Sequence, residues 1–275
     1  MTSGDATRAL KRYGVKEIFD TVQGEGSRSG ARSVFLRFTG CNAWNGRTED
    51  RAKGKGECAR WCDTDFVGGE VLGASEILQR LEALWSGKAN AAGYLPERWV
   101  VISGGEPALQ LDTALVTELH RAGWSIAVET NGSVNNAVLY RVDHLTVSPK
   151  RGMPLLVSVP EDSDAVTELK VVLPGTDRAG EGWTDVELGE LASAGGRGWD
   201  HLFVQPMDPI DQRYVETSFL HRNLKNRQQG ALPQFSPDIA PVNVYRGHLK
   251  RCLSFVREHT EWRISLQQHK LMDVR

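Results

Sequence analysis

The sequence lacks any hydrophobic run approaching the roughly 20 residues that a membrane-spanning helix requires. It also lacks a large excess of one charge: 33 Lys and Arg residues stand against 35 Asp and Glu residues, for a formal net charge of −2. A strong global field that would attract nucleic acid or an anionic membrane is thereby excluded. The opening segment MTSGDATR has no apolar core of the kind that signal peptides carry, so we expect a cytoplasmic protein.

Cysteine is scarce, with four in 275 residues. Cys41, Cys58 and Cys62 lie close together in the sequence, whereas Cys252 stands alone. Cytosolic thiols are kept reduced, so a tight cluster of them indicates metal binding or catalysis rather than disulfides. Cys252 is spaced with apolar neighbours on one face of an expected helix, which is typical of a buried core residue.

Three clustered thiols leave two kinds of metal site open. A structural zinc site usually has four ligands, and none of the seven histidines falls within the cysteine segment, so zinc would need a distant histidine. An iron–sulfur cluster held by three thiolates would instead keep one iron open for a substrate or cofactor.

Short apolar segments alternate with helical or irregular ones along the chain. We expect strands over 13–19, 33–38, 99–103, 125–128, 144–147, 169–173, 201–204 and 262–266, and helices over 75–85, 111–119 and 242–259. Several of these strands are apolar without alternation, which favours an α/β fold with a largely parallel sheet and crossover helices. Polar, glycine-containing motifs follow the strands, so we expect them to meet in one cleft at the carboxyl ends of the strands.

The composition, 40% hydrophobic and 25% charged, is that of a globular protein. No internal repeat or clear linker divides the chain, so we expect a single domain over residues 1–275. Two stretches interrupt it. Residues 42–57 form a polar loop between the first two clustered cysteines, and residues 209–241, with four prolines, are interpreted as a surface insertion or lid-like loop.

The clustered cysteines sit within motifs that point to a family. GCN at 40–42, CARWCDT at 58–64 and GGEP at 104–107 resemble the radical S-adenosylmethionine (SAM) enzymes. Within that superfamily the chain is similar to the 7-carboxy-7-deazaguanine synthase family, from about residue 14 to the end apart from 209–241, through KEIF (16–19), QGEG (23–26), ETNG (129–132), SPK (148–150), ELKVV (168–172), QPMD (205–208), WR (262–263) and HK (269–270).

The resemblance implies a radical SAM fold, a partial (open) β/α barrel with mostly parallel strands. It implies a lyase that converts 6-carboxy-5,6,7,8-tetrahydropterin to 7-carboxy-7-deazaguanine with loss of ammonia, in queuosine and 7-deazapurine biosynthesis. The implied cofactors are a [4Fe-4S] cluster, SAM and Mg²⁺. The implied partners are the small pterin substrate and an electron donor such as flavodoxin or ferredoxin, and the family also implies a homodimer.

The resemblance also assigns residues to the site. Cys41, Cys58 and Cys62 would ligate the cluster, with no catalytic residue expected beyond the cluster and SAM. SAM would be bound by Trp61, Cys62, Asp63, Gly105, Ser148, Pro149, Lys150, Gln205, Pro206, Met207 and Asp208. The substrate would be bound by Val22, Gln23, Gly24, Arg37, Ser103 and Arg275. Thr64 would be the magnesium ligand, with Asp63 or Asp65 as the alternative.

Some of these assignments also have a reason in the chemistry of the residue. Glycine at 105 would allow a ligand to approach the backbone closely. Arg37 can fork onto a carboxylate, and the implied substrate carries one. The C-terminus would fold back so that the Arg275 carboxylate contacts the pterin amino groups.

The cysteine spacing departs from the usual radical SAM pattern in two places. The first gap holds 16 residues, a long insert that this family is known to carry, and the second holds three residues where two are usual. We expect the extra residue to bulge the loop without the loss of a ligand. Two other functions remain: a radical SAM activase acting on a partner protein, which would need a large exposed docking face, and a non-catalytic metal-binding module.

Overall fold

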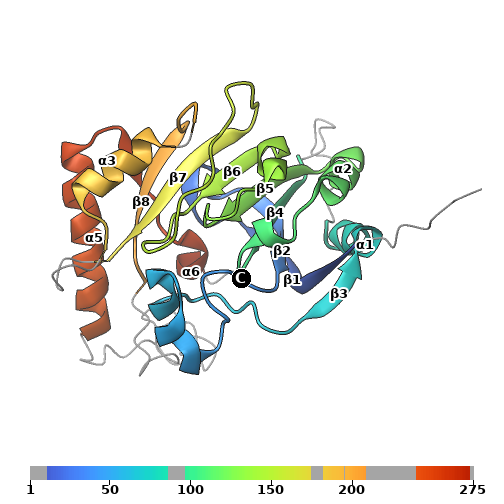
Figure 1. The fold of residues 1–275 in the computed structure, drawn as a ribbon, viewed down its shortest axis with the longest axis horizontal. Helices are drawn as coiled ribbons and strands as arrows, with labels where there is room; N and C mark the ends of the chain where they lie inside the picture. The colour runs from blue at the N-terminus through green and yellow to red at the C-terminus, as the bar shows by residue number, and fades with distance from the viewer. Residues whose placement is uncertain (1–10, 86–96, 175–181, 195, 209–239, 273–275) are drawn as a thin grey trace, which may run out of the picture.

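The computed structural model describes residues 11–85, 97–174, 182–194, 196–208 and 240–272. In these ranges nine strands form one sheet (Figure 1): β1 (Arg12–Val22), β2 (Arg32–Phe38), β3 (Glu70–Gly73), β4 (Trp99–Gly104), β5 (Ser125–Thr130), β6 (His144–Val147), β7 (Val166–Leu173), β8 (His201–Pro206) and β9 (Trp262–Ile264). Their order is β3-β1-β2-β4-β5-β6-β7-β8-β9, and the sheet is not closed into a barrel.

Strand direction divides the sheet into two parts. β1 pairs antiparallel with both β2 and β3, whereas each pair from β2–β4 through β8–β9 is parallel. The expectation of an open, mostly parallel α/β sheet is confirmed. The sequence reading missed the short strand β3 and ended the first strand three residues early, because both segments are partly exposed and have no continuous apolar run.

Helices pack beside the two halves of the sheet (Figure 1). α1 (Ala74–Leu84) and α2 (Thr113–Arg121) lie beside the half that contains β4 and β5, while α3 (Asp185–Ser193) and α5 (Ala240–Glu258) lie beside β7 and β8. Local signals start two of these helices. The Asp112 side chain accepts from the backbone N–H of Leu115, and Thr184 forms a capping box with Glu187.

Two hydrophobic cores lie between the sheet and these helices. The larger core joins β1, β2, β4, β5 and β6 to α1 and α2, and the smaller joins β7, β8 and β9 to α3 and α5. Cys252 on α5 is fully buried in the smaller core, beside Phe255, as the helical spacing predicted. The expected insertion at 209–241 lies largely outside the described residues, since α5 begins at Ala240.

The connections place the site. Residues 39–69, between β2 and β3, carry the three clustered cysteines and the short 3-10 helices η2 (Thr48–Lys53) and η3 (Glu57–Arg60). The short helix α6 (Gln268–Met272) follows β9. Because β2 and the strands from β4 onward are parallel, the segments that follow them leave at one edge of the sheet, and the motifs of the sequence collect there. Within the described residues, no helix has the length and apolar character to span a membrane.

Candidate active site

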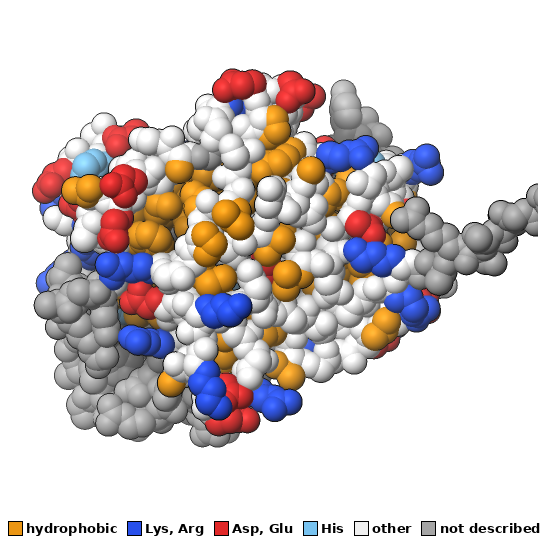
Figure 2. Space-filling view, viewed as in Figure 1, with side chains coloured by type: hydrophobic (Ala, Val, Ile, Leu, Met, Phe, Trp, Pro, Cys, Tyr) orange, Lys and Arg blue, Asp and Glu red, His pale blue; other side chains and the backbone are white. Residues whose placement is uncertain are grey.

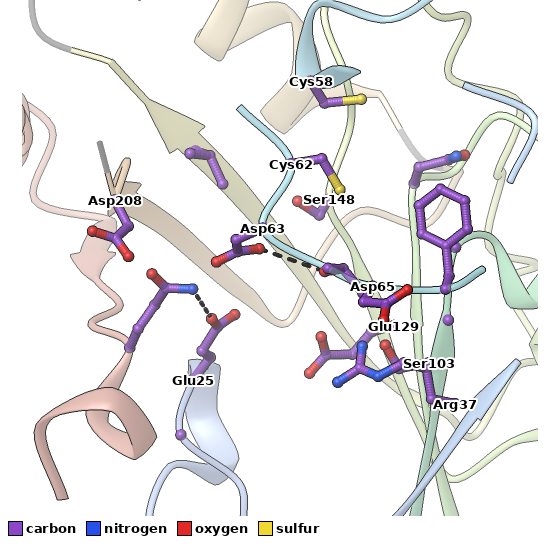
Figure 3. A pocket seen from close by; sticks show the side chains of 18 of the residues that line it. Glu25, Arg37, Cys58, Cys62, Asp63, Asp65, Ser103, Glu129, Ser148 and Asp208 are labelled. Atoms are coloured by element: carbon purple, nitrogen blue, oxygen red, sulfur yellow. Dashed lines mark hydrogen bonds between the residues drawn. The ribbon is translucent and has the colours of Figure 1, made fainter. Parts of the chain in front are cut away.

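The carboxyl edge of the sheet surrounds a pocket of about 620 Å³. Its wall combines β1 and β2, the cysteine-bearing loop, the ends of β4 to β8 and the start of α6 (Figure 3). The prediction that separate strand-end motifs meet in one cleft is therefore confirmed. All the sequence-assigned site residues line this pocket except Pro149, which is buried beside it, and Arg275, which lies outside the described residues.

Three free thiols lie on one side of the pocket. Cys41 follows β2 directly after Gly40, whose φ of 80° turns the chain, and Cys58 belongs to η3. The backbone N–H of Cys62 donates to the carbonyl of Cys58 at 2.7 Å, so the three intervening residues form one tight turn. Cys58 and Cys62 consequently present their sulfur atoms to the same space (Figure 3), and the extra residue in the spacing is absorbed without moving a thiol out of the pocket.

Burial governs the acidity of these thiols. It raises the pKa of Cys58 to about 11, against the opposing effect of the Lys150 ammonium, and it also raises the pKa of Cys41 and of Cys62. Protonated thiols in an apolar wall give up their protons when a cationic metal group binds them, because that group compensates the thiolate charge.

The spacing of the sulfur atoms separates the two metal sites that the sequence left open. Tetrahedral zinc bonds thiolates at about 2.3 Å, which brings their sulfur atoms within roughly 4 Å of one another. Over the described part of the chain, no three metal-binding side chains that include a cysteine come within 4.8 Å of one another. An iron–sulfur cluster does not require such close sulfur atoms, because each thiolate would bind a different iron atom.

The turn after β4 packs directly on the cysteine loop. The backbone N–H of Gly105 donates to the carbonyl of Phe38, and that of Glu106 donates to the carbonyl of Gly40 at 2.9 Å. A Cβ atom on Gly105 would lie 2.1 Å from the Gly40 oxygen and 2.7 Å from the Cβ of Cys41. Glycine is thus required at 105 by the close approach of two backbones beside the first cysteine.

Glu106 is fully buried behind this turn and ties it to the end of β5. Its carboxylate accepts from the Thr130 hydroxyl at 2.6 Å and from the backbone N–H groups of Asn131 and Ala108. Burial raises the pKa of Glu106, while these three donors oppose the rise. The GGEP and ETNG motifs are therefore one hydrogen-bonded unit, a pairing that the sequence did not indicate.

The SPK motif approaches the pocket from the end of β6. Lys150 donates to the Ser148 hydroxyl at 2.8 Å, and its ammonium lies 5.6 Å from the centre of the Trp61 ring. The QPMD motif at the end of β8 lies across the pocket. Gln205 is 4% exposed and bonds to Glu25 and Ser265, so it is already engaged within the protein.

Lys270 links the cysteine loop to the β8 end. Its ammonium lies 2.6 Å from Asp63 and 2.7 Å from Asp208, and it also donates to Gln267. Although burial would raise the pKa of Asp63, Lys270 brings it down to about 2. A single lysine of α6 therefore fixes two carboxylates that the resemblance assigns to SAM, whereas the sequence indicates Lys270 only as part of the HK motif.

The three candidates for a magnesium ligand, Asp63, Thr64 and Asp65, are consecutive in the sequence. Thr64 is half-buried, and its hydroxyl donates to Asp63 at 3.4 Å. Asp63 is held by Lys270, and Asp65 by Lys16 at 2.7 Å.

Arg37 and Ser103 lie side by side, because they are partners in the parallel pairing of β2 and β4 (Figure 3). The Nε of Arg37 donates to Glu17 at 2.9 Å, and its side chain is 19% exposed. Glu17 is a pocket residue that the sequence reading did not assign to the site.

A buried group of charges on this side of the pocket was also not assigned. The Lys170 ammonium binds the Glu25 carboxylate and lies 3.6 Å from Glu129. Burial alone would raise the pKa of Glu25, but Lys170 brings it down to about 2. Gln23 donates to Glu129 at 2.8 Å, so the QGEG, ETNG and ELKVV motifs meet here. In the sequence, the feature that these motifs share is their position after or within strands.

The C-terminal segment folds back onto this group. The backbone N–H of Gln268 donates to the carbonyl of Gly24, and a Cβ on Gly24 would lie 2.0 Å from the ring of His269. His269 is a pocket residue, and burial lowers its pKa, so its ring is neutral at pH 7.

The comparisons with known proteins agree on one family. The chain is 36% identical over 269 residues to a 7-carboxy-7-deazaguanine synthase of Burkholderia multivorans, covering 95% of this chain and 99% of that protein. It is 34% identical to the synthase of Caulobacter vibrioides over 94% and 98% of the two chains. The chain belongs to the 7-carboxy-7-deazaguanine synthase family.

Two further comparisons concern the fold and the family models. The alignment with the crystal structure of QueE from Escherichia coli covers 93% of each of the two chains, with a TM-score of 0.54 and 22% sequence identity, which shows a shared fold. No family model matches the chain. Membership in the 7-carboxy-7-deazaguanine synthase family makes this protein a radical SAM lyase, and the cofactors implied are a [4Fe-4S] cluster and SAM.

Proposed function

We propose that this pocket converts 6-carboxy-5,6,7,8-tetrahydropterin to 7-carboxy-7-deazaguanine with loss of ammonia. The observation that carries the proposal is that three free thiols, the glycine turn at 105 and a group of buried charges line one pocket. Cys41, Cys58 and Cys62 would hold the cluster. When bound, the cluster and SAM supply the radical that abstracts hydrogen from the substrate.

The residues on the cluster side hold SAM. Gly105 packs directly on the Gly40 backbone and so shapes the turn beside Cys41 that would contact SAM. Asp63 and Asp208 are both held by the Lys270 ammonium, while Ser148 and Lys150 approach from the end of β6. The remaining assigned residues, Trp61, Pro149, Gln205, Pro206 and Met207, would surround the adenosyl portion.

The residues on the other side hold the pterin. Arg37 beside Ser103 supplies a guanidinium for the substrate carboxylate. Glu25 stays ionised at neutral pH because Lys170 holds its pKa low, so its carboxylate can accept from pterin N–H groups. Val22, Gln23 and Gly24 border the same space. These donors and acceptors fix the position of the ring and exclude water from it.

Mg²⁺ and the C-terminus complete the proposed site. Thr64 would be the metal ligand, because salt bridges hold its neighbours Asp63 and Asp65. Mg²⁺ takes few protein ligands, so substrate oxygens and water would complete the shell. Adding a C-terminal tag beyond Arg275 should weaken substrate binding while uncoupled SAM cleavage persists, and unchanged steady-state kinetics in a tagged protein would refute this role.

The electron donor would approach on the other side of the cysteine loop. A hollow of about 460 Å³ there is lined by Arg51, Lys55, Arg60 and Arg151, with Glu57 as its one acid. Gly56 also lines it, and a Cβ there would lie 3.2 Å from the sulfur of Cys58, so little protein separates this basic surface from the cluster position. Figure 2 shows Lys and Arg side chains beside acidic ones at the lower edge, where the cysteine loop lies in Figure 1. An acidic donor such as flavodoxin or ferredoxin fits this surface.

The proposal includes the organisation of the molecule. The chain would form one domain, because a single sheet carries both cores. It would act as a homodimer in the cytoplasm, where thiols stay reduced. Light scattering of the purified protein tests the dimer. The deciding experiment incubates the anaerobically reconstituted protein with SAM, reductant and carboxytetrahydropterin. Deazaguanine product by mass spectrometry is expected, and 5′-deoxyadenosine without that product would reject the proposal.

A further inference from the structure

The insert between the first two cysteines places a tryptophan against the third. Trp44 is 7% exposed, packs edge-on against Phe66 at 5.6 Å between ring centres, and shares a hydrophobic cluster with Cys62. Its indole nitrogen is buried and has no hydrogen-bond partner in the described part of the chain. A buried donor without an acceptor is costly and calls for a physical reason.

The cluster around Trp44 includes Cys41, Cys58 and Cys62, so cysteine sulfur is the acceptor type in its surroundings. Arg51, which stacks on the Trp44 ring, also donates to the Cys62 carbonyl, and this ties the indole to Cys62 in particular. A neutral thiol accepts hydrogen bonds weakly, whereas a thiolate accepts them well. The indole N–H is therefore placed to gain its partner when Cys62 carries a metal group.

Arg51 contacts both the Trp44 ring and the turn that carries Cys58 and Cys62. Its two terminal nitrogens donate to the carbonyl oxygens of Ala59 at 2.7 Å and Cys62 at 2.9 Å. Its guanidinium also stacks on the Trp44 ring, 4.6 Å from the ring centre. The planar fork of arginine makes both carbonyl contacts at once, which a lysine does not reproduce. Arg51 thus fixes the tight turn that carries Cys58 and Cys62 while it holds the indole in place.

Space around this pair is tightly limited. A Cβ on Gly54 would lie 2.2 Å from the Cβ of Ala59 and 3.2 Å from that of Trp44. The backbone N–H of Lys55 donates to the carbonyl of Ala43 at 2.8 Å, which closes the insert on itself. The Trp44 side chain consequently has little room to move within this cluster.

We propose that Trp44 and Arg51 are positioning residues for the cluster: Trp44 donates its indole N–H to the Cys62 thiolate and raises the reduction potential, and Arg51 keeps Cys62 in place. The proposal rests on the proposed function, since it needs a cluster at the three cysteines. Hydrogen bonds to cluster sulfurs stabilise the added negative charge of the reduced state. The insert over residues 42–57 would then help to set the potential at which the cluster accepts an electron.

The test is an anaerobic redox titration of the reconstituted enzyme, followed by electron paramagnetic resonance. Trp44→Phe keeps the aromatic packing and removes the N–H. We expect full iron content and about a tenfold lower ratio of reduced to oxidised cluster at a fixed potential, equivalent to about 59 mV for a one-electron couple. Trp199→Phe is the matched control, because it removes an indole N–H that bonds to the Leu191 carbonyl away from the pocket.

Two outcomes separate the hypotheses. A Trp44→Phe protein with full iron and an unchanged ratio would overturn the indole contact and leave the proposed function intact. An unsubstituted protein that takes up no [4Fe-4S] cluster would overturn the proposed function and this inference with it. Should Trp44→Phe fail to fold, pulsed resonance on unsubstituted protein with ¹⁵N-labelled tryptophan decides: a coupling to indole nitrogen is expected, and its absence refutes the contact.

Arg51 has its own readout. Arg51→Lys keeps the charge but loses the two-carbonyl fork, so we expect iron loss to a chelator to become about tenfold faster. Arg80→Lys, at an exposed pair with Glu70, is the control and should lose iron at the unsubstituted rate. Equal rates in Arg51→Lys and the unsubstituted enzyme would remove Arg51 from the proposal.

Discussion

Lys170 offers the sharpest test of how the pocket is held together. Its ammonium is 4% exposed, binds the buried Glu25 carboxylate and lies 3.6 Å from Glu129. The neighbouring carboxylates raise the pKa of Lys170 despite its burial, so it is charged at neutral pH. We expect Lys170→Met to leave buried negative charge without a partner.

The cost follows from the pKa of Glu25. Its fall from 4.5 to about 2 corresponds to about 3 kcal/mol of folding free energy. Because the folded pKa is the lower one, this stabilisation is fully present above pH 4.5 and is lost as the pH falls toward 2. Independently of the pKa, the removal of one partner of a buried ion pair is expected to cost roughly 3–5 kcal/mol of folding stability. We therefore expect Lys170→Met to lose about 3 kcal/mol or more at pH 7.

Urea unfolding of the metal-free protein, followed by tryptophan fluorescence, measures this loss. In the variant, burial without Lys170 raises the pKa of Glu25, so the folded state binds a proton at a higher pH than the unfolded chain does. The deficit relative to the unsubstituted protein should then shrink as the pH falls from 7 to 5.

Two variants serve as controls. Lys170→Arg keeps the cation and should recover most of the stability, whereas Lys16→Met, which breaks the exposed pair with Asp65, should cost far less than Lys170→Met. A Lys170→Met protein as stable as the unsubstituted one, or a deficit that does not change with pH, would refute the reasoning.

Three further predictions concern the cofactor side. Gly105→Ala places a Cβ 2.1 Å from the Gly40 oxygen, so SAM binding in equilibrium dialysis should fall at least tenfold; normal binding would contradict the close packing. Lys270→Met frees the Asp208 carboxylate and should raise the KM for SAM more than it lowers kcat. An unchanged KM would refute this prediction. Cys252→Ser should leave the iron content unchanged but lower stability, because the hydroxyl is buried in the α5 core, and iron loss would place this cysteine among the ligands.

Much of the fold could be predicted because local patterns determine it. The continuous apolar segments within β4 and β5 indicated buried parallel strands, and helical spacing placed Cys252 in a core. β3 was missed because Val71 is 57% exposed, and so was α3, which starts from a capping box at Thr184 rather than from a strong apolar face. Segments like these are fixed by the neighbours they pair with, which no local pattern records.

The candidate site divides in the same way. Chemistry that resides in one motif was readable: the thiols, the glycine turn and the arginine of β2 all line the pocket. The functions of Lys170 and Lys270 were not readable, because a lysine in a sequence is most often solvated and its burial depends on carboxylates far along the chain.

The sequence by itself determined which chemical groups are available and that they follow strands which end at one edge. Only the tertiary structure decided which groups are paired, and therefore which carboxylates are ionised, and that the indole N–H of Trp44 is buried without a partner among the described residues. The physical reason is that charge and hydrogen bonding depend on distance and burial, and both are set by contacts between segments remote in the chain.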